Sequence, residues 1–150
     1  MSDFSCDYDL SDADRIGGAI GLALAPGDVV LLSGDLGAGK TTLARAMLKA
    51  RGLAGEAPSP TFAIVQPYAP PEVDLAIAHV DLYRIEDEDE LIELGLDDYL
   101  YDGALLIEWP ERLGGARWPD ALALTISGSG AARVLTADVP PAWEARWSLR

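Results

Sequence analysis

The stretch Gly34-Asp35-Leu36-Gly37-Ala38-Gly39-Lys40-Thr41 decides the fold of this chain, because it fills the phosphate-loop pattern G-x-x-x-x-G-K-[ST]. Glycines let backbone N–H groups turn inward around a phosphate without a Cβ in the way. In this pattern the lysine reaches the β- and γ-phosphates of a nucleotide, and the hydroxyl binds Mg²⁺. A helix that begins at the loop adds the positive end of its dipole.

The sequence on both sides of the loop supports this interpretation. Residues 29–33 form a short apolar run typical of a buried strand, and a turn signal at 26–28 precedes it. Apolar residues recur at helical spacing from 43 to 48, after the loop. A glycine-rich turn that fits the pattern by chance would lack these flanks. The candidate nucleotide contacts from the motif are Asp35, Leu36, Gly37, Ala38, Gly39, Lys40, Thr41 and Thr42.

Composition narrows the class of protein. The 150 residues suit one domain, 1–150, and they contain neither an internal repeat nor a linker. A net charge of −14 argues against a large nucleic-acid surface, so we expect no DNA partner and any RNA to be held by another protein. No apolar run approaches the roughly 18 residues of a membrane span. The acidic N-terminus lacks a secretory signal, and Cys6 is the one cysteine, so we expect a cytoplasmic protein.

Hydrophobic patterning predicts an α/β protein. We expect an edge strand over 4–10, a helix over 12–24 and a proline-rich turn over 67–71. Further helical pieces are expected after residue 87 and over 97–102, and core strands over 29–33, 61–66, 75–83, 104–109, 121–127 and 133–139. The last two strands are separated by only a few residues, which favours an antiparallel hairpin at one edge of the sheet.

Two acidic residues stand at strand ends. Asp81 closes one apolar strand and Glu108 closes another, and ligands of open α/β sheets gather at the carboxyl ends of strands. An isolated acid in such a place usually marks only where a strand meets solvent. Beside a phosphate-loop motif, however, a pair of carboxylates is what Mg²⁺ and an attacking water require. We therefore take Lys40, Asp81 and Glu108 as catalytic candidates, and Thr41, Asp81 and Glu108 as metal candidates.

Three other features have simpler interpretations. The acidic run at 86–90 is typical of a solvated helix start, with a docking patch for a basic partner as the alternative. His79 lies inside an apolar strand and is interpreted as a packed side chain rather than a base. Arg133, in the last hairpin, is a further candidate for approaching a nucleotide.

Taken together, the motifs resemble those of a known family. The stretches Gly34–Thr42 (GDLGAGKTT), Ser59–Phe62 (SPTF), His79–Arg84 (HVDLYR), Glu93–Leu96 (ELGL) and Ile107–Glu111 (IEWPE) occur in this order. The chain thereby resembles the TsaE (YjeE) family of bacterial ATPases of tRNA threonylcarbamoyladenosine synthesis, over about residues 10–135. The resemblance implies a P-loop NTPase-like three-layer α/β fold whose central sheet is mainly parallel and has antiparallel edge strands.

The resemblance also carries functional expectations. It implies binding of ATP or ADP with Mg²⁺, and weak ATPase activity of the protein alone. It also implies action with the proteins TsaB and TsaD, in which ATP hydrolysis resets the complex that these two proteins form. By position, Lys40 and Thr41 match the phosphate and magnesium ligands, Asp81 the catalytic aspartate and Glu108 the magnesium-linked glutamate. Thr61 matches a threonine of a switch-like loop, and Trp109 a tryptophan beside the site.

Alternative functions remain open at this point. A small nucleotide kinase shares the loop but needs arginines on a lid, and no lid-like insertion is visible. A GTPase needs an asparagine-containing guanine reader, and this chain has no asparagine. A nucleotide-dependent interaction module that seldom hydrolyses ATP is the non-enzymatic alternative.

Overall fold

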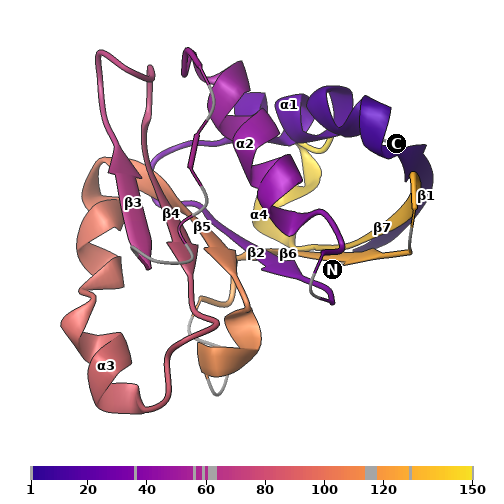
Figure 1. The fold of residues 1–150 in the computed structure, drawn as a ribbon. Helices are drawn as coiled ribbons and strands as arrows, with labels where there is room; N and C mark the ends of the chain where they lie inside the picture. Colours follow the sequence, from indigo (N-terminus) through magenta and orange to yellow (C-terminus); the bar gives the residue numbers. More distant parts are fainter. Residues whose placement is uncertain are drawn as a thin grey trace.

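A mixed seven-stranded sheet organises the chain (Figure 1). The computed structural model describes residues 2–35, 37–55, 57–58, 60, 64–113, 118–128 and 130–149. The strands are β1 (Ser2–Asp9), β2 (Val29–Ser33), β3 (Val65–Tyr68), β4 (Ala76–Asp81), β5 (Gly103–Glu108), β6 (Leu122–Ser127) and β7 (Ala132–Val139). They lie in the order β1-β7-β6-β2-β5-β4-β3.

The centre of the sheet is parallel and its edges are antiparallel, as expected. β2 pairs in parallel with both β5 and β6, and β4 pairs in parallel with β5. β3 and β1 run antiparallel to their neighbours β4 and β7. The predicted β6–β7 hairpin is present, but it does not form the edge, because β1 pairs along the whole of β7 and takes that place.

The prediction for the segment around β3 was wrong in its bounds. We expected a strand over 61–66 and a turn over 67–71, whereas β3 spans Val65–Tyr68 and includes Pro67. Residues 61–63 lie outside the described part. An edge strand has one paired side only, so a proline without an N–H can sit in it without breaking the ladder.

Helices cover both faces of this sheet. α1 (Ala13–Ala23) and α2 (Lys40–Ala50) run side by side over one face, with α4 (Pro141–Glu144) near the C-terminus (Figure 1). The other face is covered by α3 (Glu88–Glu93) and by a 3₁₀ segment, η2 (Leu96–Tyr101). Short 3₁₀ turns η1 (Leu10–Asp12) and η3 (Pro110–Leu113) precede α1 and follow β5.

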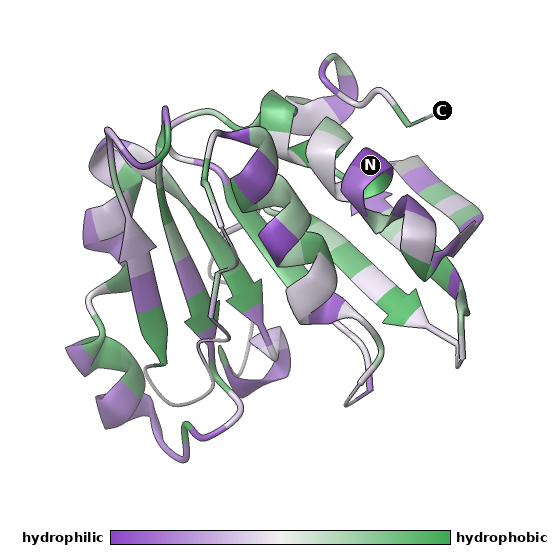
Figure 2. Cartoon of the chain, turned by 45° about the horizontal axis from the view of Figure 1, so that its top comes forward, coloured by the Kyte–Doolittle hydropathy of each residue, from purple (hydrophilic) through white to green (hydrophobic). Residues whose placement is uncertain are grey.

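Successive side chains of the central strands point to opposite faces of the sheet and so contribute to two separate hydrophobic cores. In β5 the residues Ala104 and Leu106 pack toward α1 and α2, while Leu105 and Ile107 pack toward α3 and η2. In Figure 2 the central strands are mainly green, whereas much of α3 is purple. A strand buried on both faces is expected to read as a continuous apolar run, as these do.

Small residues set the distance between α1 and α2. A Cβ added to Gly21 would lie 2.7 Å from the Met47 carbonyl oxygen, and one added to Gly17 would lie 2.5 Å from the Ala46 Cβ. By contrast, a Cβ at Gly18 would meet Ala50 at an ordinary 3.8 Å. Glycine therefore keeps α2 close to α1.

This packing predicts opposite effects for two neighbouring alanine substitutions. Gly21→Ala should lower the free energy of unfolding by about 1–3 kcal/mol, since it overpacks the interface. Gly18→Ala should raise it by up to about 1 kcal/mol, because alanine is the better helix former and the site has room. Urea unfolding of both variants checks this pair. Equal effects would contradict the packing described.

Within the described ranges, no helix combines the length and apolar character of a membrane span.

Candidate nucleotide-phosphate site

The sheet brings three polar side chains of β4 and β5 to one face. His79 and Asp81 are two residues apart in β4 and therefore point to the same side. Asp81 pairs directly with Glu108 in the parallel ladder. This side is the one that α2 covers, so the strand ends and the helix start share a pocket. The two strand-end acids predicted from the sequence are thus brought together.

The glycine-rich loop, residues 34–39, connects β2 to α2. Gly34 has φ +144° and Gly39 has φ +108°, conformations that side chains strongly disfavour. A Cβ at Gly34 would also lie 2.4 Å from the Ile126 carbonyl oxygen. α2 begins at Lys40, so the N–H groups of its first turn have no carbonyl within the helix to bind and face the loop. The backbone therefore offers donors to an anion at this point.

Lys40 is buried in the pocket, with only 5% of the residue exposed. Its ammonium donates to the carbonyl oxygens of Gly34 at 2.6 Å and Asp35 at 3.0 Å. It also lies 4.0 Å from the centroid of the Trp109 ring, a cation–π distance. Burial lowers the pKa of Lys40, and the carboxylates of Glu108, Glu111, Asp81 and Asp35 oppose that shift by favouring the charged form.

Thr41 and Glu108 form the centre of the site. The Thr41 hydroxyl lies 2.9 Å from Glu108 Oε1 and 2.8 Å from Glu108 Oε2. Glu108 itself is buried, with only 3% of the residue exposed. Asp81 is also buried, and its Oδ1 accepts a hydrogen bond from the Tyr83 N–H at 2.9 Å. Two carboxylates and a hydroxyl thus converge beside one ammonium, and hard oxygen ligands of this kind suit Mg²⁺.

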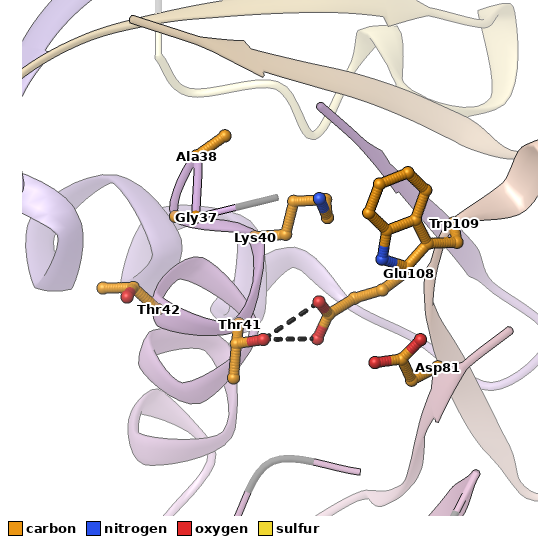
Figure 3. A pocket seen from close by; sticks show the side chains of 9 residues that line it. Gly37, Ala38, Lys40, Thr41, Thr42, Asp81, Glu108 and Trp109 are labelled. Carbon is orange, nitrogen blue, oxygen red and sulfur yellow. Dashed lines mark hydrogen bonds between the residues drawn. The ribbon is translucent and has the colours of Figure 1, made fainter. Parts of the chain in front are cut away.

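These groups line one pocket of about 220 Å³. In Figure 3 the two carboxylates enter it from the strand side, opposite Thr41, with Lys40 and Trp109 beside them. The lining residues are Gly37, Ala38, Gly39, Lys40, Thr41, Thr42, Asp81, Glu108 and Trp109. Asp35 does not line the pocket but accepts from Lys40 through its carbonyl. The candidates Leu36 and Thr61 lie outside the described residues.

Two residues have closer links to the site than the sequence indicated. His79, interpreted as packing, is completely buried as expected, yet its Nε2 lies 2.7 Å from Glu108 Oε2. Arg133 donates from Nε to the Ala38 carbonyl at 2.8 Å and so ties β7 to the glycine-rich loop. Only the parallel register of β4 and β5, which no local pattern fixes, puts His79 beside Glu108.

Most of the chain matches the model of a known protein family. A family model described as threonylcarbamoyl adenosine biosynthesis protein TsaE matches residues 8–135. The chain belongs to the TsaE family. The resemblance drawn from the sequence motifs is therefore confirmed, and the match includes the glycine-rich loop and both strand-end acids.

Individual TsaE relatives are similar over much of the chain. The "tRNA threonylcarbamoyladenosine biosynthesis protein TsaE" of Bacillus subtilis is 40% identical over 106 residues, covering 70% of this chain and 65% of the relative. The protein of the same name from Mycobacterium bovis is 40% identical over 111 residues, covering 69% and 66%. That of Haemophilus influenzae is 47% identical over 85 residues, covering 56% and 52%. The matches thus span between half and two thirds of each relative.

A solved structure extends the likeness to the whole fold. The crystal structure of Bacillus subtilis YdiB superposes with a TM-score of 0.78 at 26% identity, covering 97% of this chain and 91% of that chain. The predicted fold class, an α/β P-loop NTPase-like sheet with a parallel centre and antiparallel edges, is confirmed.

Proposed function

We propose that this TsaE-family chain binds ATP with Mg²⁺ and hydrolyses it within tRNA threonylcarbamoyladenosine biosynthesis. One observation carries the proposal: the Thr41 hydroxyl, at the start of the helix after the glycine-rich loop, is hydrogen-bonded to the buried carboxylate of Glu108. In phosphate-loop NTPases, Mg²⁺ is held by the loop Ser or Thr together with a strand-end carboxylate, which there is an aspartate. The names of the relatives supply the pathway.

The pocket suits a metal–nucleotide complex better than either component alone. Two nearly buried carboxylates would repel a triphosphate, so a divalent cation is needed to bring the charges together. Within the described residues, no three His, Cys, Asp or Glu side chains are grouped to hold a metal by themselves. Mg²⁺ is commonly held by one or two carboxylates together with substrate phosphates, which fits this site.

Each residue then has a defined task. Lys40 and the N–H groups at the start of α2 would bind the phosphates, and Thr41 with Glu108 would hold Mg²⁺, which when bound would supply neutralisation of the phosphate charge. Asp81 orients water at the same edge of the sheet. Catalysis would rest mainly on positioning and charge neutralisation rather than on a strong base. We expect ATP and ADP to be preferred over guanine nucleotides.

We further propose that hydrolysis is weak in the isolated chain and is stimulated by TsaB and TsaD. The net charge of −14 supports an indirect relation to tRNA, held by those partners rather than by this chain. The nucleotide-dependent interaction module is the competing function, since it would use the same pocket without turnover.

Single-turnover hydrolysis separates the two functions. With excess protein over radiolabelled ATP and with Mg²⁺, we expect slow phosphate release from the chain alone and a rise of at least about tenfold when TsaB and TsaD are added. EDTA should abolish the rise. Binding of ATP without any release of phosphate in the complex would contradict the ATPase and favour the interaction module.

A further inference from the structure

We propose that His79 is the positioning residue of Glu108, and that it fixes the orientation of the Glu108 carboxylate beside Thr41. The inference rests on the proposed function, because it assigns a task toward the Mg²⁺ that Glu108 and Thr41 would hold. It concerns a buried residue of β4 that is not among the residues lining the pocket.

The contact is short, buried and directional. His79 Nε2 lies 2.7 Å from Glu108 Oε2, and none of the histidine is exposed. An ionised carboxylate only accepts hydrogen bonds, so Nε2 carries the proton and donates. His79 Nδ1 is buried without a hydrogen-bond partner in the described part of the chain. Among the described residues, Glu108 is thus the one hydrogen-bond partner of this ring, so packing alone does not explain a polar residue at this buried position.

Thr41 and His79 both make hydrogen bonds to the Glu108 carboxylate, and the way they share its two oxygens indicates what the histidine does. The Thr41 hydroxyl lies within 2.9 Å of both Glu108 oxygens, but it has a single proton and can serve only one of them at a time. His79 engages Oε2 but not Oε1, so among the described residues Oε1 has no donor besides Thr41, and the histidine contact fixes the orientation of the carboxylate. Without the N–H of His79, a carboxylate with 3% exposure would lose a donor that water cannot readily replace.

The strand geometry makes this arrangement rigid. His79 is held in β4 next to Leu106 of β5, and Glu108 follows two residues later on the same face. Partners that orient a ligand residue in this way commonly change metal affinity when they are lost. We therefore expect His79 to influence the Mg²⁺ dependence of nucleotide binding, and to leave metal-free nucleotide binding largely unchanged.

A pair of amide substitutions isolates the donor position. The side-chain nitrogen of glutamine can occupy the place of Nε2, whereas that of asparagine corresponds to Nδ1 and does not reach Glu108. His79→Asn should raise the Mg²⁺ concentration that half-saturates ATP binding by about tenfold or more, and His79→Gln by no more than about threefold. ADP affinity in EDTA should stay within about twofold of wild type in both. Ile77→Val, a buried change on the same face of β4, is the control for core damage and should not shift the Mg²⁺ dependence.

The single histidine of the chain gives a second readout that needs neither nucleotide nor activity. In ¹⁵N-histidine-labelled protein we expect one ring signal in the Nε2–H form, with a slowly exchanging proton whose shift changes in Glu108→Gln. An Nδ1–H form, or a signal indifferent to Glu108→Gln, would overturn the proposal, as would equal Mg²⁺ responses of the Asn and Gln variants. Wild-type binding that ignores Mg²⁺ would instead overturn the proposed function, and the ring signal would then decide the contact alone.

Discussion

Replacing Lys40 by alanine is expected to weaken ATP binding about ten- to a hundred-fold, the equivalent of roughly 1.5–3 kcal/mol for a charge-assisted contact. In the structure the ammonium is held on the carbonyls of Gly34 and Asp35 and under the Trp109 ring. The Lys40 ammonium is therefore placed at the glycine-rich loop. Isothermal titration calorimetry with Mg²⁺ and ATP measures the loss.

The chain provides a matched control for this experiment. Lys49 is the only other lysine, lies at the far end of α2 and pairs with Asp14 at the surface. Lys49→Ala removes the same charge from the same helix, so it should leave ATP affinity within about twofold of wild type. Wild-type affinity in Lys40→Ala, or equal losses in the two variants, would contradict a phosphate contact by Lys40.

Asp81→Ala and Glu108→Ala are each expected to lower turnover in the presence of TsaB and TsaD by about a hundred-fold. Their effect on ATP affinity should be smaller, about tenfold or less, because the loop and Lys40 still bind the phosphates. Both carboxylates are buried at the same edge of the sheet and in register with each other. Single-turnover hydrolysis and calorimetry on the same preparations give the two numbers.

Substitution of an exposed acid is the control for the loss of one negative charge. Glu72, on the turn after β3, is exposed, and Glu72→Ala should leave turnover unchanged. If Asp81→Ala or Glu108→Ala hydrolyses ATP at the wild-type rate with both partners present, that residue has no part in the mechanism. A loss of turnover that merely follows a loss of ATP affinity would assign the residue to binding.

Local patterns were sufficient for the elements that form the site. The glycine spacing, the apolar run at 29–33 and the strand-end acids Asp81 and Glu108 are each readable within a few residues. The parallel order of the central strands then follows from the fold class. The convergence of the two acids could be expected because the carboxyl ends of parallel strands share one edge of a sheet.

The features that sequence patterns did not predict depend on pairing between strands that are far apart in the chain. The bounds of β3 depend on its antiparallel partner β4, which keeps Pro67 in the strand. The place of β1 outside the hairpin depends on pairing between the two ends of the chain. His79 was interpreted as packing because an isolated histidine in an apolar strand usually is; its contact with Glu108 arises from the β4–β5 register, which hydrophobic patterning leaves undetermined.

A crystal structure with Mg²⁺ and a non-hydrolysable ATP analogue tests the central claim most directly. The account predicts the β- and γ-phosphates in the glycine-rich loop, Lys40 on the phosphates and the Thr41 hydroxyl on Mg²⁺. Glu108 and Asp81 should both lie within about 8 Å of the metal, the reach of a carboxylate through one water. Phosphates bound elsewhere, or either carboxylate beyond that distance, would contradict it.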